Sequence, residues 1–297
     1  MSDSDGVLVV DKPAGPTSHD AVDRVRKAFG TRRVGHTGTL DPFATGVLPV
    51  CVGKATRLSR FLMEGEKVYV AGVRLGFATT TDDFTGEALG PPQAAAPERA
   101  LLEAACQRFV GPLDQVPPAY SAKRVAGRKM YELARTGKAV EGTASRVFIH
   151  AIRLGAAAGD SFEVEVRCSP GTYIRALARD LGIALGVGGH LVSLRRTRSG
   201  EFGLEEAVSW DELVAAARDR LIPMARLLSH FPAVRVAPEG LQALGHGQTL
   251  VARHLLAALE FPAGQRVRIL DPRGELLALA VAGKATLKPD VVLLESL

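Results

Sequence analysis

One carboxylate is notable for the residues that surround it. Asp41 lies in the string GHTGTLDPFATG, residues 35–46, which combines three glycines and a histidine directly ahead of an apolar segment. A carboxylate is ionised at neutral pH and can act as a nucleophile or a base without a cofactor. The plainer interpretation is a turn, because aspartate bonds its own backbone and proline presets φ. The string therefore predicts either a catalytic loop or an ordinary turn ahead of a core strand.

Two further residues are candidates within regular elements. Tyr69 lies in the alternating segment 67–75, and Arg175 lies in the helical pattern of residues 172–185. On the pattern alone, they are a strand-forming aromatic residue and a solvated helix arginine.

The cysteines and histidines do not suggest a metal site. Cys51, Cys106 and Cys168 are far apart and form no C-x-x-C pair, and the seven histidines form no H-E-x-x-H motif. Residues 1–6 lack the features of a signal peptide, and no run of about 18 apolar residues follows. We therefore expect no metal, no secretion and no membrane insertion, and the reducing cytoplasm as the location.

The composition fits a folded protein with an anionic partner. Hydrophobic residues make up 46% of the 297 residues, which is enough for one sizeable core and a second small one. The net charge of +5 and the pI near 9.3 favour a polyanion as partner. Basic residues gather in three places, where they could bind phosphates or simply keep the surface soluble. These places are Arg32 with Arg33, the segment 123–138, and Arg195, Arg196 and Arg198.

The periodicity predicts a mixed α+β domain. Thr17 or Ser18 can cap a helix that ends at Gly30, and the absence of a regular βαβ rhythm argues against a doubly wound sheet. Expected strands are 6–10, 47–52, 67–75 and 161–168, and further expected helices are 97–110 and 172–185.

The sequence pattern changes near Pro232, from expected helices before it to expected short strands after it. Residues 210–218 and 223–230 are expected to be helices that close the first domain, and a turn is expected at residues 271–274. Expected short strands are 234–236, 249–252, 266–270, 276–281 and 291–294. Together they predict a small β-rich barrel.

The string at 35–46 closely resembles the G-H-x-G-x-L-D-P-x-A-x-G signature of TruB-type pseudouridine synthases. Other segments resemble further motifs of this family, in the family's order, over most of the chain. These are DKPAGPTS at 11–18, Lys67-Val68-Tyr69 with Gly76, Thr79, Thr81, Asp83 and Gly86, PPAYSAK at 117–123, GTYIR at 171–175 and LRR at 194–196.

The resemblance implies a bacterial enzyme that isomerises uridine 55 in the T-loop of transfer RNA, with no cofactor. Asp41 is then the catalytic nucleophile or base, and Arg175 forms an ion pair with it. Tyr69 stacks on the flipped uracil and is a candidate to remove the C5 proton. The implied substrate-binding residues are His36, Lys12, Tyr173, Leu194, Lys123 and Arg124.

The resemblance also implies a domain plan and a partner. Residues 1–231 form the catalytic domain, with an RNA-clasping insertion at about 113–140, and residues 232–297 form a PUA-like RNA-binding β-barrel. The implied partner is the T-arm of transfer RNA, bound by a monomer that needs no protein partner.

Three other interpretations are considered. A synthase with this fold could depend on a guide RNA, or the scaffold could bind or fold RNA without catalysis. A generic α+β domain is the third. The combination of Asp41, Tyr69 and Arg175 argues against a purely binding protein, because binding alone does not need all three.

Overall fold

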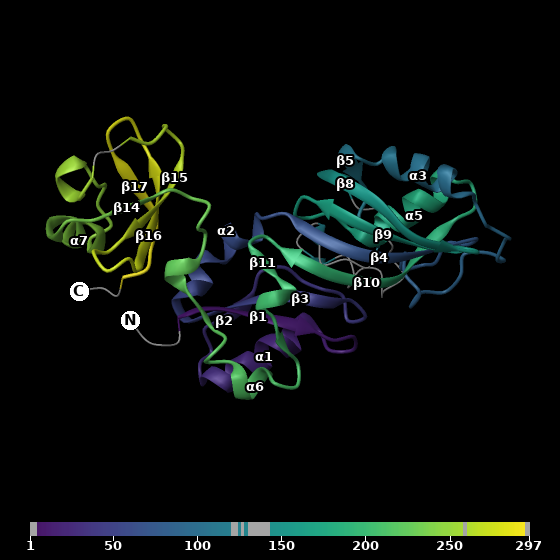
Figure 1. The fold of residues 1–297 in the computed structure, drawn as a ribbon, viewed down its shortest axis with the longest axis horizontal. Helices are drawn as coiled ribbons and strands as arrows, with labels where there is room; N and C mark the ends of the chain where they lie inside the picture. Colours follow the sequence, from purple (N-terminus) through teal and green to yellow (C-terminus); the bar gives the residue numbers. More distant parts are fainter. Residues whose placement is uncertain (1–4, 120–123, 126–127, 130–142, 258–259, 295–297) are drawn as a thin grey trace.

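Two β-sheets organise the chain (Figure 1). The computed structural model describes residues 5–119, 124–125, 128–129, 143–257 and 260–294, with only the backbone of residues 124–125 and 128–129. Within these ranges no helix is long and apolar enough to cross a bilayer.

The large sheet contains the residues of greatest interest. Its strands are β1 (Gly6–Lys12), β2 (Val34–His36), β3 (Thr45–Val52), β4 (Lys67–Leu75), β5 (Gly111–Gln115), β8 (Ser145–Ala158), β9 (Ser161–Cys168), β10 (Gly189–Ser199), β11 (Phe202–Gly203), β12 (Val208–Ser209) and β13 (Ile222–Pro223). Its main path runs β12-β1-β3-β10-β4-β9-β8-β5. β1 pairs with β12 and β3 pairs with β10 in parallel, whereas the other pairs on this path are antiparallel. The expected mixed α+β class is confirmed.

The α-helices of the described residues pack in three different cores. They are α1 (Ser18–Phe29), α2 (Ser59–Met63), α3 (Arg99–Gln107), α5 (Ile174–Ala184), α6 (Leu213–Ala216) and α7 (Pro238–Gly245). α6 joins α1, α3 and α5 on one face of the large sheet, whereas α2 lies in the core shared by the two sheets and α7 packs on the small sheet. α1 begins after a Thr17 capping box and ends at Gly30, whose φ of 65° suits glycine. Apolar residues of α1, α3 and α5 pack on the inward residues of β1, β3, β4 and β9 in one hydrophobic core.

The small sheet consists of β14 (Ala233–Arg235), β15 (Arg266–Leu270), β16 (Leu276–Ala282) and β17 (Leu287–Val292). In Figure 1 it lies beyond α2, at the far end from α3 and α5. Leu276 and Leu279 join Val7 and Val9 of β1 in a second core, so the two sheets are packed through apolar contacts. The described strands follow the open path β14-β15-β16-β17. The closed barrel therefore stays a prediction.

Three sequence expectations about the C-terminal third are wrong. Only Leu213–Ala216 is α-helical within 210–218, and residues 223–230 contain one short 3-10 turn, Met224–Arg226. Residues 249–252 form no strand beyond a bridge at Leu250. Short apolar segments such as these have no period long enough to distinguish a helix or strand from an irregular segment.

The expected insertion lies mostly outside the described residues. β6 (Arg124–Val125) and β7 (Arg128–Lys129) pair in an antiparallel ladder. β5 and β8, which flank the segment, pair with each other at one edge of the large sheet. The segment therefore starts and ends at the same place on the sheet.

Candidate active site

A cavity of about 830 Å³ opens beside the middle of the large sheet. Its wall combines the loop at residues 37–43 with side chains from β4 and β10 and with the start of α5. Its volume falls in the range typical of small-molecule sites, roughly 300–1,000 Å³. The three residues expected to be catalytic, Asp41, Tyr69 and Arg175, all line it.

The Asp41 loop is fixed by bonds to α1 and by a turn of its own. The Ser18 hydroxyl accepts from the Leu40 amide at 2.8 Å and donates to the Leu40 carbonyl at 3.1 Å. The Ala44 amide donates to the Asp41 carbonyl at 3.0 Å, which is the turn expected of an Asp-Pro pair. The turn and the cavity-lining carboxylate are thus the same feature.

Lys12 supports this loop from inside the protein. Its side chain is fully buried, and Nζ donates to the carbonyls of Pro13, Pro16 and Pro42 at 2.8, 2.7 and 3.1 Å. Burial lowers the pKa of this ammonium to about 8, against the opposing effect of the Asp41 carboxylate. Lys12 therefore supports the loop, and the RNA contact that the resemblance implies for it stays a prediction.

Arg175 grips Asp41 with two nitrogens. Nε lies 3.0 Å from Oδ2 of Asp41, and Nη2 donates to Oδ1 at 3.2 Å. The Arg175 side chain is 7% exposed and that of Asp41 is 34% exposed, so the pair is open on the carboxylate side. Burial raises the pKa of Asp41 above its ordinary value, while the charge of Arg175 opposes this rise. The arginine orients the carboxylate and favours its ionised form.

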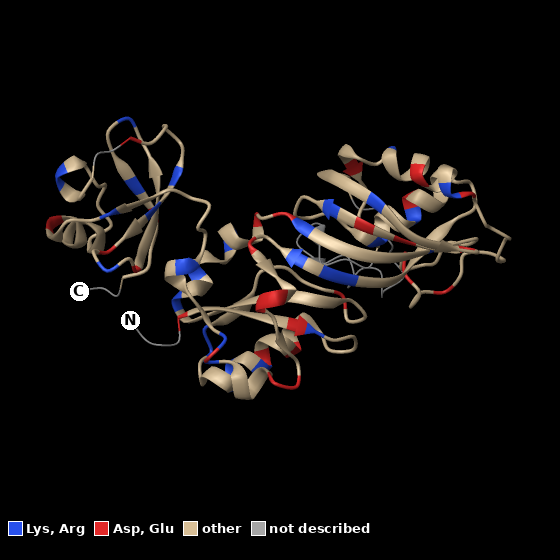
Figure 2. Ribbon diagram, viewed as in Figure 1, with Lys and Arg blue, Asp and Glu red and all other residues tan. Residues whose placement is uncertain are grey.

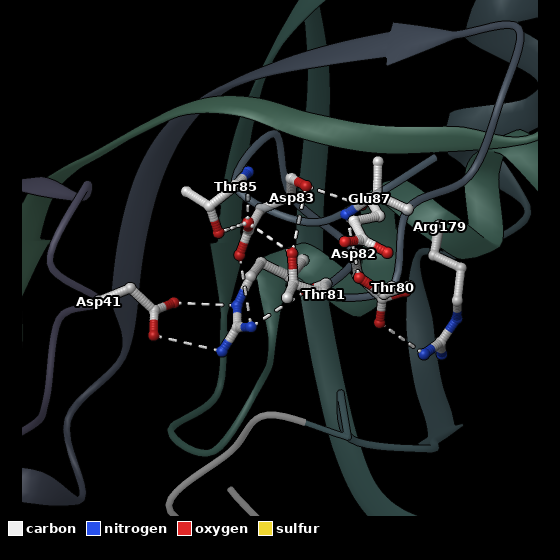
Figure 3. Close-up of polar contacts among 10 residues, drawn as sticks. Asp41, Thr80, Thr81, Asp82, Asp83, Thr85, Glu87 and Arg179 are labelled. Carbon is white, nitrogen blue, oxygen red and sulfur yellow. Dashed lines mark hydrogen bonds and ion pairs between the residues drawn. The ribbon is translucent and has the colours of Figure 1, made fainter. Parts of the chain in front are cut away.

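A second carboxylate, Asp83, holds Arg175 from the other side (Figure 3). Its Oδ2 lies 3.4 Å from Nη1 of Arg175, and its Oδ1 accepts bonds from the Thr81 hydroxyl and the Thr85 amide and hydroxyl. Figure 3 shows Asp41 on one side of this network and Asp83, Thr81 and Thr85 on the other. Asp83 belongs to one of the motifs that resemble the family, but it was not among the expected site residues.

A neighbouring ion pair keeps the Asp83 loop in place. Arg179, one turn after Arg175 on α5, donates from Nη1 to Asp82 at 2.9 Å and from Nη2 to the Val116 carbonyl at 3.1 Å. Asp82 itself has a φ of 60°, a left-handed conformation that a non-glycine residue adopts only when its surroundings hold it. The loop that carries Asp83 is therefore tied to α5 at two positions.

Tyr69 lines the cavity from strand β4. It is 8% exposed and, like Leu194, lines the cavity from the central strands. Burial raises the pKa of the Tyr69 phenol, and the charge of Arg196 opposes this rise. The buried Tyr69 side chain therefore lies at the cavity wall beside the Arg196 cation.

Arg196 corrects an expectation. We expected it at the surface among phosphate-binding arginines, but it is 1% exposed. Its Nε donates to the Val47 carbonyl at 2.7 Å and its Nη2 to the Gly38 carbonyl at 3.0 Å. Arg195, the next residue, is partly exposed and forms an ion pair with Asp11 at 2.8 Å. Alternation along a strand places the two neighbours on opposite faces of the sheet.

Lys67 lines the cavity, although it was quoted only as part of a motif and was not among the expected site residues. It is 5% exposed, and Nζ donates to the carbonyls of Gly65 and Met63 at 2.7 and 3.3 Å. Burial, assisted by the charge of Arg196, lowers the pKa of Lys67 to about 8. Its position two residues before Tyr69, on the same face of β4, was the available signal.

Tyr173 lies at the start of α5 and lines the cavity. Its amide donates to Oε1 of Gln115 at 2.8 Å, and Nε2 of Gln115 donates back to its carbonyl at 3.0 Å. Gln115 is buried and was not anticipated. The paired hydrogen bonds connect the end of β5, where the expected insertion starts, to the helix that carries Arg175.

The remaining expected binding residues are His36, Lys123 and Arg124, of which only His36 has a described side chain. His36 is half-buried and is not part of the cavity wall, and its Nδ1 accepts from the Gly38 amide at 3.3 Å. Burial lowers the pKa of His36, and Arg196 acts in the same direction. Lys123 lies outside the described residues, and Arg124 is described only as backbone in β6. In the described part of the chain, no group of three or more acidic, histidine or cysteine side chains could hold a metal ion.

Two family models match the chain. Residues 26–174 match the model described as TruB family pseudouridylate synthase (N terminal domain). Residues 175–229 match the tRNA pseudouridylate synthase B C-terminal domain. The boundary between the two matches falls at Arg175, so the Asp41 loop lies in one and its arginine partner in the other.

Curated relatives span nearly the whole chain. A tRNA pseudouridine synthase B of Burkholderia mallei is 44% identical over 290 residues, 96% of each chain. The protein of the same name from Ralstonia nicotianae is 44% identical over 301 residues, 97% of this chain and 94% of the relative. That of Chromohalobacter salexigens is 46% identical over 248 residues, 82% and 81% of the two chains.

Solved structures share the fold at lower identity. A chain of a Cbf5-Nop10-Gar1 complex superposes with a TM-score of 0.77 at 28% identity, covering 100% of this chain and 87% of that one. A chain of an H/ACA ribonucleoprotein bound to a substrate RNA containing 2′-deoxyuridine has a TM-score of 0.76 at 27% identity, covering 98% and 86%.

Proposed function

The chain belongs to the TruB family of pseudouridylate synthases, and we propose that it converts uridine 55 in the T-loop of transfer RNA to pseudouridine. The observation that carries the proposal is the Asp41 carboxylate, gripped by Arg175 at the wall of a cavity that can hold a nucleoside. In this reaction the N1-glycosidic bond of uridine breaks and the ribose is rejoined to C5 of the same uracil.

Asp41 starts the reaction in this proposal. It acts either as a nucleophile on the ribose or as the base that begins cleavage of the glycosidic bond, and both routes need an ionised carboxylate. The bidentate contact with Arg175 supports that state against the burial that opposes it. The Asp83 network keeps the guanidinium in place from behind. No external cofactor enters either route.

The uracil enters the cavity by leaving its stack in the RNA. Enzymes that act on a base inside a folded nucleic acid extrude it into a pocket, and an aromatic face then restores part of the lost stacking. The Tyr69 ring and the Leu194 side chain supply the apolar surface here. We assign the late removal of the C5 proton to the Tyr69 hydroxyl.

The RNA contacts outside the cavity are assigned to two regions. The basic insertion at about 113–140, with Lys123 and Arg124, clasps the T-arm through phosphate contacts. Residues 232–297 form a PUA-like RNA-binding domain with a boundary at Pro232. The shared core between Leu276 and the β1 valines means that this domain and the catalytic sheet support each other.

We propose further that the protein works as a stand-alone cytoplasmic monomer. Identity to the tRNA pseudouridine synthase B of Burkholderia mallei is 44%, against 27–28% for the chains from the H/ACA ribonucleoprotein and the Cbf5-Nop10-Gar1 complex. The direct test is to incubate the purified protein alone with an unmodified tRNA transcript and to map pseudouridine. Modification at position 55 supports the proposal, and a requirement for added guide RNA or partner proteins overturns it. A transcript with cytidine at position 55 is the matched control.

A further inference from the structure

Arg196 is a buried cation with an unusual set of partners. Its guanidinium is held by two backbone carbonyls, those of Val47 and Gly38. Within the described ranges, no carboxylate lies at ion-pair distance from it, unlike the neighbouring pair of Arg195 with Asp11. Burying a charge costs free energy unless an opposite charge and hydrogen bonds compensate it. The uncompensated charge at the cavity therefore needs a functional explanation.

The strand register places this charge beside Tyr69. Arg196 on β10 and Tyr69 on β4 are direct cross-strand partners, so their side chains project from the same face of the sheet as neighbours. Both line the cavity. Figure 2 shows basic segments where β4 and β10 run together in the middle of the large sheet. The cation and the phenol are thus held together by the sheet itself.

The other charged groups near Tyr69 leave Arg196 as the dominant influence. Lys67 projects from the same face two residues earlier, and its ammonium is occupied by the carbonyls of Gly65 and Met63. Cys168 on β9 stays a neutral thiol at neutral pH, because burial raises its pKa to about 11. Asp41 is already paired with Arg175. Among the neighbouring charges, that of Arg196 has the largest effect on the pKa of Tyr69, and it lowers this pKa.

We propose that Arg196 is a positioning residue for the Tyr69 hydroxyl and that its uncompensated charge stabilises the phenolate that removes the C5 proton. This inference rests on the proposed function, which assigns the proton removal to Tyr69. A buried phenol is a poor base on its own, because burial disfavours its charged form. A fixed cation beside the oxygen lowers that cost and needs no rearrangement during the reaction.

The proton removal conserves atoms and electrons. After C5 has joined the ribose, the C5–H bond breaks and its proton passes to the phenolate oxygen of Tyr69. The electron pair of that bond forms the C5=C6 double bond, and the pair of the former N1=C6 bond moves onto N1. N1 takes a proton from water, and the phenol returns its proton to water before the next turnover. Arg196 makes and breaks no covalent bond.

The first test measures the Tyr69 pKa without substrate. Ultraviolet titration of phenolate, with the matching Tyr69→Phe protein subtracted in each background, isolates this one of the four tyrosines. Arg196→Gln keeps donors for the backbone carbonyls and loses the charge, so it should raise the Tyr69 pKa by about one to three units. Arg196→Lys should stay within about one unit of the unmutated protein. Arg195→Met, on the opposite face, should leave the value unchanged.

The second test measures the step itself. Release of tritium from uracil C5, followed against pH in single turnover, should slow about tenfold for each unit by which Arg196→Gln raises the Tyr69 pKa. Arg196→Lys should recover most of this lost rate because it keeps the positive charge. If Arg196 only held the Gly38 carbonyl in place, its substitution would not shift the pH dependence of the rate. An unchanged Tyr69 pKa in folded Arg196→Gln protein overturns the inference. Tritium release at the full rate by Tyr69→Phe would instead overturn the role of Tyr69 as the base. The titration without substrate tests the effect of Arg196 on the Tyr69 pKa independently of that role.

Discussion

Arg175 contacts the two carboxylate oxygens of Asp41 with two different nitrogens, at 3.0 and 3.2 Å, and directs a third nitrogen to Asp83 at 3.4 Å. The guanidinium therefore stands between two acids, one open to the cavity and one buried. Its planar fork fixes the orientation of Asp41 in a way that a lysine could not reproduce. The charge of Asp83 also acts on Asp41, because a nearby negative charge disfavours ionisation of that carboxyl.

The first prediction uses that coupling. The proposed function requires ionised Asp41, whose pKa lies above the ordinary value of 3.8, so the rate should fall as the pH falls through this raised pKa. The charge of Asp83 is one cause of the rise. Asp83→Asn should therefore move the acidic limb of the single-turnover pH profile to lower pH. Asp160→Asn, at an exposed site, should leave it in place, and a limb displaced to higher pH would contradict the coupling.

The second prediction concerns stability and Lys12. Its pKa is about 8 in the folded protein, against an ordinary value of 10.5, so between these values the unfolded chain binds the proton more tightly. Lys12 therefore adds a rise in unfolding free energy as the pH increases from about 8 to 10.5. Lys12→Met should flatten that rise and, at neutral pH, cost about 1–3 kcal/mol because three carbonyls lose their donor. Denaturant titrations at several pH values, with Lys27→Met as the exposed control, measure both effects. If the unfolding free energy of the Lys12 variant rose with pH as steeply as that of the unmutated protein, the explanation would be ruled out.

The third prediction separates the ring of Tyr69 from its hydroxyl. Tyr69→Phe should bind RNA normally and still open the glycosidic bond, but it should release pseudouridine slowly. Tyr69→Ala should in addition weaken capture of the base, by about 1–3 kcal/mol from lost stacking. Binding measurements beside tritium release from C5 distinguish the two. Equal defects in both variants would remove the stacking role.

The fourth prediction addresses the basic insertion. Neutralising Lys123, Arg124 and Lys129 should flatten the dependence of tRNA affinity on salt, since each lost phosphate contact lowers the slope by roughly one unit or less. The control neutralises the same number of exposed arginines elsewhere, Arg108, Arg153 and Arg220, and should keep the slope. The slope of log affinity against log salt is the measurement. Equal slopes in the two triple variants would mean that the insertion is not the clasp.

Local signals in the sequence predicted the elements that carry the site. The alternating segments at 67–75 and 161–168 are strands with those bounds, and α1 begins at the Thr17 cap and ends at Gly30 as expected. These features depend on neighbours in the chain, such as period, capping and turn chemistry. They therefore follow from short stretches of sequence.

The parts that were missed depend on contacts between distant strands. β10 was not anticipated, because its central pair Arg195-Arg196 interrupts the apolar pattern of a buried strand. The burial of Arg196 follows from its place opposite Tyr69 and beside the Val47 carbonyl, residues far away in the chain. The position of Asp83 behind Arg175 likewise depends on how two loops meet at α5. No local pattern encodes these relationships.

The central claim is that Asp41 performs the chemistry, and one substitution tests it most directly. Asp41→Asn keeps the shape of the side chain and removes its charge, so it should abolish pseudouridine formation while leaving tRNA affinity within about tenfold. Asp160→Asn makes the same chemical change at an exposed ion pair and should retain activity. The measurement is single-turnover pseudouridine formation on a tRNA transcript at saturating protein. Loss of product with retained binding is the predicted result, and product formation by Asp41→Asn at a rate near that of the unmutated protein would contradict the account.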